Sequence, residues 1–168
     1  KSNILDMIRE ELSAVVDANT PGNHAEEWDL EALIAEVNSI VKLSDEFAPE
    51  ALAAMTPDAI LEAVIEFAED AYDDKEEELT SDIMRQLERY FLLQVIDTHW
   101  REHLDSMDYL REGIHLRGMA QKDPLVEYRV EGHAMFEQMM ISVQGEVVSL
   151  LFHTEVTAEE AEELEQQH

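Results

Sequence analysis

The sequence predicts an all-α protein. Residues that favour helices, chiefly Ala, Leu, Glu, Met and Gln, are abundant, whereas the 168 residues include only 5 Gly and 4 Pro. Apolar residues recur at helical spacing through most of the chain, and no segment of useful length alternates as a strand does. We expect a long helix and an antiparallel helical hairpin, together with a small inserted group of helices.

The first half of the chain predicts short amphipathic helices. Residues 4–18 and 28–42 each carry an apolar stripe, and the first stripe ends before a turn at 20–23. After a break at 44–46, a short helical segment is expected at 49–54. Thr56-Pro57 then predicts an N-cap followed by a proline at the first helical position. The helix that starts there leads into the acid-dense residues 69–78, which we interpret as an exposed helix end or connector.

A longer helix is expected from about residue 80 to 117. Its apolar or aromatic positions lie about 3.4 residues apart on average, close to the 3.5 repeat of helices that pack side by side. Gly113 lies inside this helix, where glycine lowers helix stability by about 1 kcal/mol relative to Ala. Its presence indicates close packing or local flexibility. The positions are Ile83, Leu87, Tyr90, Leu93, Ile96, Trp100, Leu104, Met107, Leu110 and Ile114.

A second long helix is expected to fold back against the first. Arg117-Gly118 predicts the end of the first helix, and Asp123-Pro124 predicts the start of the next, which continues to about 152. The short loop between them makes the two helices antiparallel neighbours, with Met119 at the tip of the hairpin. A flexible apolar side chain at that place favours contact with a partner over burial. Beyond 154 the chain is polar and acidic, which predicts a frayed helix or a disordered tail.

The net charge of −29 is unevenly distributed. Residues 1–84 carry 4 Lys and Arg against 23 Asp and Glu, whereas residues 85–135 carry 7 against 9 and are nearly neutral. A basic surface suited to nucleic acid is absent, so no nucleic-acid partner is expected. With no Cys, there is no disulfide framework or thiolate zinc site. No apolar run is long enough to span a membrane, and the start at Lys1 without an initiator Met predicts a fragment.

One segment offers a catalytic alternative. His99-Trp100-Arg101-Glu102-His103 fits H-x-x-E-H, in which two histidines on one helix face bind zinc and the Glu activates water. The motif is short, and no third ligand can be named from the sequence. The competing interpretation is that His99 and His103 are hydrogen-bonding or exposed helix residues. Because no phosphate-binding loop is present, the chain taken alone is not expected to be an ATPase.

Residues 100–128, WREHLDSMDYLREGIHLRGMAQKDPLVEY, carry a long and specific resemblance. With MRQLE at 84–88, Ile96-Asp97 and Met135-Phe136, they are similar to the C-terminal helical scaffold of the SecA family, the bacterial motors that move preproteins through the membrane channel. The resemblance is strong over 80–153. Over 1–79 it follows the position and helical character of that family's helical wing more than its letters.

The resemblance implies a non-catalytic part of a larger ATP-hydrolysing translocase. Residues 1–20 would end the long scaffold helix, 21–79 would form the helical wing, and 80–153 the scaffold with its two-helix finger, whose tip is 118–123. Residues 154–168 would be an acidic tail or linker. No cofactor is expected in this fragment, because ATP and Mg²⁺ would bind elsewhere in the parent protein.

The resemblance also implies roles for single residues of the finger. Members of the family often have Tyr at the tip where this chain has Met119, and both side chains are large and partly apolar. Contact with preprotein and channel is expected at Leu116, Arg117, Gly118, Met119, Ala120, Gln121 and Lys122. Restraint of ATP hydrolysis is expected from Asp108, Tyr109, Leu110, Arg111 and Ile114. Packing of the scaffold is expected at Trp100, Leu104, Met107, Tyr128, Met135 and Phe136.

The partners that the resemblance implies are the other SecA domains, the SecYEG channel, unfolded preprotein and, through the parent protein, an anionic membrane surface. The other domains are the two nucleotide-binding folds and the preprotein-binding domain. The expected location is the bacterial cytoplasm and the cytoplasmic face of the inner membrane, as a peripheral protein. Two alternatives stay open: a free-standing helical interaction adaptor, and a zinc hydrolase that uses His99, Glu102 and His103.

Overall fold

The structure is a computed structural model that describes residues 1–22, 24–118 and 123–156, and every regular element in those ranges is helical. This confirms the all-α prediction. The elements are α1 (Ser2–Asn19), the 3₁₀ helix η1 (Ala25–Glu27), α2 (Leu30–Ile40), α3 (Pro49–Leu52), α4 (Pro57–Leu79), α5 (Ser81–Gly113), α6 (His115–Gly118) and α7 (Pro124–His153).

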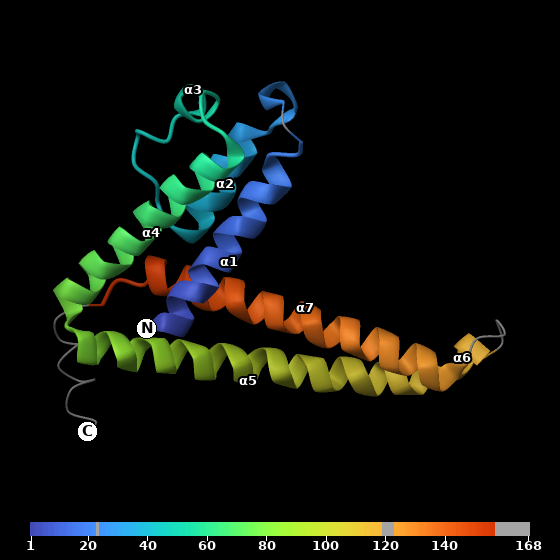
Figure 1. The fold of residues 1–168 in the computed structure, drawn as a ribbon. Coiled ribbons are helices and arrows are strands. Elements are labelled where there is room, and N and C mark those ends of the chain that lie inside the picture. Colours follow the sequence, from blue (N-terminus) through green and yellow to red (C-terminus); the bar gives the residue numbers. More distant parts are fainter. Residues whose placement is uncertain (23, 119–122, 157–168) are drawn as a thin grey trace.

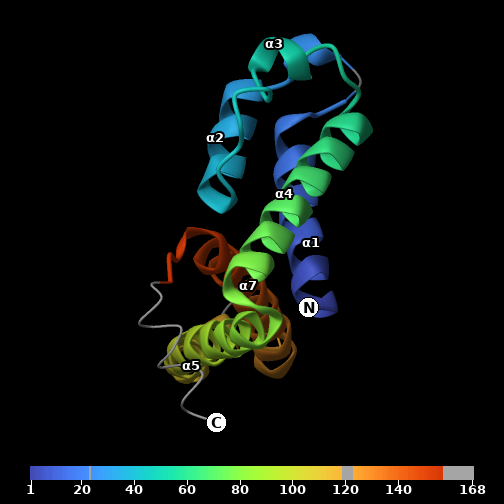
Figure 2. The ribbon, with the colours of Figure 1, turned by 90° about the vertical axis from the view of Figure 1, so that its left-hand side faces the viewer.

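Helices α5 and α7 lie side by side and antiparallel, as a long hairpin with α6 near its far end (Figure 1). At 33 and 30 residues, they are about 50 and 45 Å long at about 1.5 Å per residue. Helices α1 to α4 stand over the other end of the hairpin, and the view along the hairpin shows them rising from one side of it (Figure 2). None of the described helices combines the length and the apolar character needed to cross a membrane.

The hydrophobic core lies where α1, α2 and α4 meet the base of the hairpin. Each helix presents one face to it, as in Ile4, Ile8 and Leu12 of α1, because residues three or four apart share a helix face. Between residues 96 and 142 no buried side chain belongs to this core. We therefore call residues 1–95 and 143–156 the head, and residues 96–142 the arm.

Two predicted helix starts are confirmed. The Thr56 side chain accepts a hydrogen bond from the Ala59 amide at 3.2 Å, and Pro57 follows as the first helical residue of α4. Asp123 accepts from the Leu125 amide at 2.9 Å at the start of α7. In both places the cap satisfies an amide that the helix itself leaves without a partner.

The long helix predicted for 80–117 is interrupted. Helix α5 ends at Gly113, Ile114 forms a turn, and α6 begins at His115. A Cβ added at Gly113 would have no neighbour within 4 Å, so this glycine does not serve close packing. Of the two roles that the sequence suggested for Gly113, the structure supports local flexibility, because glycine lowers the stability of a helix interior.

The apolar stripe predicted for this helix is not one buried face. Ile83, Leu87 and Ile114 are buried, but the five positions from Tyr90 to Leu104 are 43–64% exposed. The side of α5 that faces the core carries Met84, Glu88, Phe91 and Val95 in addition to Ile83 and Leu87. Apolar residues occupy two faces of this helix, and the mean spacing merged them into one. The five exposed positions are Tyr90, Leu93, Ile96, Trp100 and Leu104.

Helices α4 and α5 join at a single strained residue, Thr80. Its φ of 75° and ψ of 153° lie in a region that is essentially restricted to glycine, which costs about 1–3 kcal/mol. Among the described residues it is the one non-glycine residue with positive φ. We call this joint the elbow.

Candidate functional site: the far end of the arm

The base of the hairpin is fixed to the head by polar contacts as well as by the core. The Lys75 ammonium of α4 donates to the carbonyl oxygens of Leu151 and Thr154, each at 2.5 Å, and so satisfies the C-terminal end of α7. Burial lowers the pKa of Lys75. On the other side, the Gln144 amide of α7 donates to the Glu11 carboxylate of α1 at 3.1 Å. These contacts tie α7 to the head.

The two helices of the arm are joined by a narrow seam. Gly132 is buried, and a Cβ placed on it would lie 2.9 Å from Cε of Met107, so the absence of a side chain lets α5 and α7 approach closely. The ring of His103 lies 5.9 Å from that of Phe136 and 5.5 Å from that of Trp100. The seam therefore contains Met107 and Phe136, two of the residues that were expected to pack the scaffold.

The histidines of the H-x-x-E-H segment take part in these contacts between helices. His99 Nε2 lies 2.7 Å from Glu146 Oε2 of α7, and His103 contacts aromatic rings. Across residues 1–22, 24–118 and 123–156, no three His, Asp or Glu side chains are grouped so that they could hold a metal ion.

Apolar side chains are exposed where the arm ends. Tyr109 is 81% exposed and Leu116 of α6 is 69% exposed, and Leu125, Val126 and Val130 of α7 are exposed as well. Ile114, by contrast, is buried at the turn between α5 and α6. Of the residues predicted to contact preprotein and channel, Met119, Ala120, Gln121 and Lys122 lie outside the described residues, and only the backbone is described for Arg117 and Gly118. Leu116 is thus the one residue of this set whose side-chain surroundings are described.

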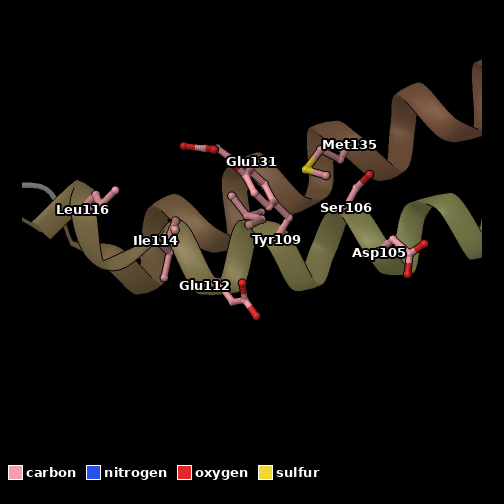
Figure 3. Close-up of a pocket in the computed structure, with 10 residues that line it drawn as sticks. Asp105, Ser106, Tyr109, Glu112, Ile114, Leu116, Glu131 and Met135 are labelled. Carbon is pink, nitrogen blue, oxygen red and sulfur yellow. The ribbon is translucent and has the colours of Figure 1, made fainter.

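A groove of about 850 Å³ runs along this end of the arm (Figure 3). Tyr109, Leu116 and Met135 give it apolar surface, and carboxylates line it as well. Leu110 and Ile114 also line the groove, so it collects three of the five residues that were expected to restrain ATP hydrolysis. The carboxylates are those of Asp105, Glu112 and Glu131.

The remaining predicted residues lie elsewhere on the arm. Asp108 and Arg111 form an ion pair of 3.2 Å on the solvent-exposed side and do not line the groove. Leu104 is exposed, and Tyr128 is half-buried. The set therefore forms no single cluster, and its arrangement offers contact surface rather than a catalytic group.

The sequence interpretation missed the carboxylates of the groove. Asp105, Tyr109 and Glu112 are spaced i, i+4 and i+7, which places them on one face of α5, and Leu116 continues that direction in α6. This spacing was visible in the sequence. The apolar residues on another face of the same helix form the longer pattern, and that pattern predicts packing.

Comparison with known proteins gives consistent matches. Residues 1–155 match the family model described as SecA Wing and Scaffold domain. Protein translocase subunit SecA of Syntrophobacter fumaroxidans is 38% identical over 161 residues, 95% of this chain and 19% of that protein. The protein of the same name from Pelotomaculum thermopropionicum is 41% identical over 93% of this chain and 18% of its own length. Protein translocase subunit SecA 1 of Mycobacterium tuberculosis is 44% identical, with coverages of 94% and 18%. The chain spans about a fifth of the length of these relatives.

Proposed function

Because the chain belongs to the SecA wing and scaffold domain family, we propose that it is the non-catalytic part of a preprotein translocase motor that presents a stiff contact arm to the translocating chain. The relatives are named as translocase subunits. In this proposal, ATP and Mg²⁺ bind to other domains of the parent protein, and the arm couples those domains to the SecY channel at the cytoplasmic face of the inner membrane.

The exposed apolar surface at the end of the arm carries the proposal. Tyr109, Leu116 and Val126 are exposed there, and none of them belongs to the core of the head. An unfolded preprotein exposes apolar side chains in many sequences, and apolar contact is non-directional, so it does not require one particular partner sequence. Met119, which the resemblance places at the tip, adds a flexible side chain suited to the same use.

The length of the hairpin and its fixed base support coupling between the motor domains and the channel. A helix pair about 50 Å long, with a base held by Lys75 and the core, transmits displacement of the head to the far end. Restraint of ATP hydrolysis is part of the proposal for the residues that the resemblance assigns to it: Asp108, Tyr109, Leu110, Arg111 and Ile114.

Photo-crosslinking from single positions tests the contact role. A photoreactive residue is placed at Tyr109, Leu116 or Val126 of the full-length parent protein, and a preprotein is stalled in the channel. Tyr90 is the matched control, because it is also an exposed aromatic residue of α5 but lies in the head. We expect preprotein crosslinks from the arm positions to exceed those from Tyr90 several-fold. Equal yields, or none from the arm, would remove the contact role.

The adaptor hypothesis has a separate test. It predicts a complete natural chain of about this length, whereas a translocase motor requires nucleotide-binding folds encoded with it. A coding sequence that continues upstream into a phosphate-binding loop would rule the adaptor out.

A further inference from the structure

The elbow joins two long helices without a loop. Helix α4 ends at Leu79 and α5 begins at Ser81, so Thr80 alone makes the change of direction (Figure 1). Its backbone lies in the region near φ 75° and ψ 153° that a β-branched residue rarely adopts. The Thr80 side chain makes no cap hydrogen bond that would offset this strain. Other contacts must hold the joint in this conformation.

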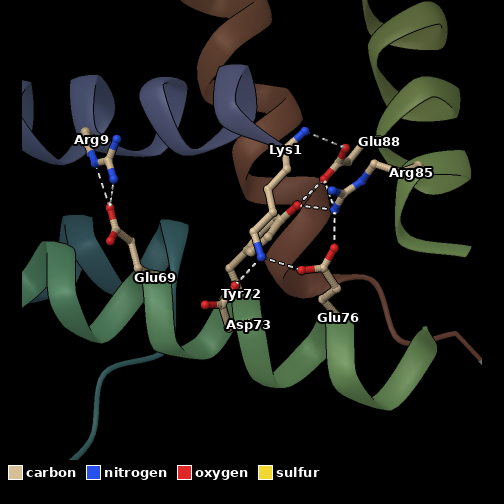
Figure 4. A network of polar contacts seen from close by, with 8 residues as sticks. All are labelled: Lys1, Arg9, Glu69, Tyr72, Asp73, Glu76, Arg85 and Glu88. Carbon is tan, nitrogen blue, oxygen red and sulfur yellow. Dashed lines mark hydrogen bonds and ion pairs between the residues drawn. The ribbon is translucent and has the colours of Figure 1, made fainter. Parts of the chain in front are cut away.

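Four polar side chains bridge the elbow (Figure 4). Arg85 of α5 pairs with Glu76 of α4 at 2.9 Å and with Glu88 of its own helix at 2.8 Å. The Tyr72 hydroxyl of α4 donates to Glu88, and Arg85 donates to that hydroxyl at 2.5 Å. We call Tyr72, Glu76, Arg85 and Glu88 the latch. Because two of them precede the elbow and two follow it, their contacts depend on the angle between α4 and α5.

Two members of the latch are buried, whereas the side chains of Arg85 and Glu76 are 31% and 15% exposed. Glu88 is 5% exposed and Tyr72 is 1% exposed. Burial and the Glu88 carboxylate raise the pKa of the Tyr72 hydroxyl, so this group stays protonated and continues to donate. A buried ion pair contributes little by itself, but removal of one partner leaves an uncompensated charge, which is strongly unfavourable. At the native angle each member of the latch contacts at least one other member, and Lys1 also pairs with Glu76 and Glu88. Arg85 Nε is buried there without a hydrogen-bond partner.

We propose that the elbow is a strained hinge held by the latch, and that the latch sets the angle at which the arm leaves the head. Loss of the latch lets Thr80 relax toward ordinary backbone angles, and α5 turns relative to α4. Because α5 is about 50 Å long, a turn of about 5° displaces its far end by about 4 Å. Helix α7 follows, since it contacts α5 along the arm. This inference goes beyond the proposed function and does not depend on what the end of the arm contacts.

Distances between nitroxide labels test the hinge. The chain has no cysteine, so labels can be attached to cysteines placed at the exposed residues Glu62 of α4 and Glu102 of α5 and measured by pulsed electron spin resonance. In Glu88→Gln and Arg85→Met variants we expect the mean distance to shift by several ångströms or the distribution to broaden about twofold. Addition of Thr80→Gly to Glu88→Gln should return the distribution toward that of the wild type, because glycine adopts the native angles without strain.

The control removes an ion pair that does not bridge the elbow. Arg9→Gln breaks the contact of α1 with Glu69 of α4 and should leave the distribution unchanged. Latch variants that keep their far-UV circular dichroism and show the wild-type distribution would overturn the proposal, as would equal broadening in Arg9→Gln. If the latch variants lose their helical signal, the stability of the single variant Thr80→Gly tests whether the elbow is strained. We expect its urea midpoint to exceed that of the wild type, and a midpoint that is equal or lower would overturn the strained hinge.

Discussion

The head and the arm are built from the same kind of helix but use their apolar residues in opposite ways. In the head, Ile8, Leu12 and Ile60 are fully buried. In the arm, Tyr109 and Ile141 are mostly exposed. The two regions even share α5 and α7, so helical periodicity does not decide which face becomes buried. The neighbouring elements decide it.

The difference has an energetic consequence. Complete burial of a Leu, Ile or Val side chain contributes about 1.5–3 kcal/mol to the stability of the fold, and the head contains many such side chains. The arm gains it mainly along the seam where Met107 faces Gly132 and at the buried Ile114. The arm therefore owes its stability to helix pairing and to its fixed base, and it keeps apolar surface available for a partner.

The largest predicted effect is a contrast between two leucines. Leu12→Ala in the head should lower the free energy of unfolding by about 2–5 kcal/mol, because it opens a cavity in the core. Leu104→Ala in the arm should change it by no more than about 0.5 kcal/mol, since that side chain is exposed. Urea titration followed by circular dichroism measures both variants. Similar losses would mean that the arm has a core of its own.

A smaller effect is expected from pH. The raised pKa of Tyr72 means that the folded chain holds this proton more tightly than the unfolded chain, whose value is 10.0. The contribution of Tyr72 to the free energy of unfolding is fully present below pH 10.0 and is lost as the pH rises through the folded-state pKa. The loss can reach at most about 1.4 kcal/mol per pH unit.

Urea midpoints of the wild type and Tyr72→Phe between pH 8 and 11 measure this effect. The slope above pH 10.0 should be shallower in Tyr72→Phe than in the wild type. Parallel curves for wild type and Tyr72→Phe would contradict the assignment.

The smallest predicted effects are those of Gly→Ala substitutions at two positions, and they have opposite signs. Gly113→Ala in the arm should raise the free energy of unfolding by about 0.5–1 kcal/mol, because nothing crowds the new methyl group and Ala favours helix. Gly22→Ala in the head should lower it by about 1 kcal/mol, because φ is +69° there. Thermal unfolding of the two variants gives the signs directly. A loss in Gly113→Ala would show that the break in α5 is required by packing.

Local chemistry made part of the fold predictable. Thr56-Pro57 and Asp123-Pro124 mark helix starts by the side chains themselves, and the structure places α4 and α7 there. The antiparallel hairpin followed from the short connection between two periodic segments. These features depend on few residues that are near in sequence.

Other features depend on contacts between distant residues, and these could not be predicted. The buried face of α5 is chosen by the head and by α7, so Trp100 and Leu104 are exposed in this chain although their spacing suggested a packed stripe. Thr80 gave no sign of its strained backbone, because the latch that holds it comes from both sides of the elbow. The role of Met119 and the division into scaffold and wing stay predictions.

Amide hydrogen exchange compares the two regions most directly. The account predicts that amides of α1, α4 and residues 84–95 and 143–151 exchange slowest, by global unfolding, because they line the core. Amides of 100–113 and 125–140 should exchange at least about tenfold faster, through local opening of the arm. Arm amides as slow as those of the head would contradict the account, since the arm would then share in a core that the structure confines to the head.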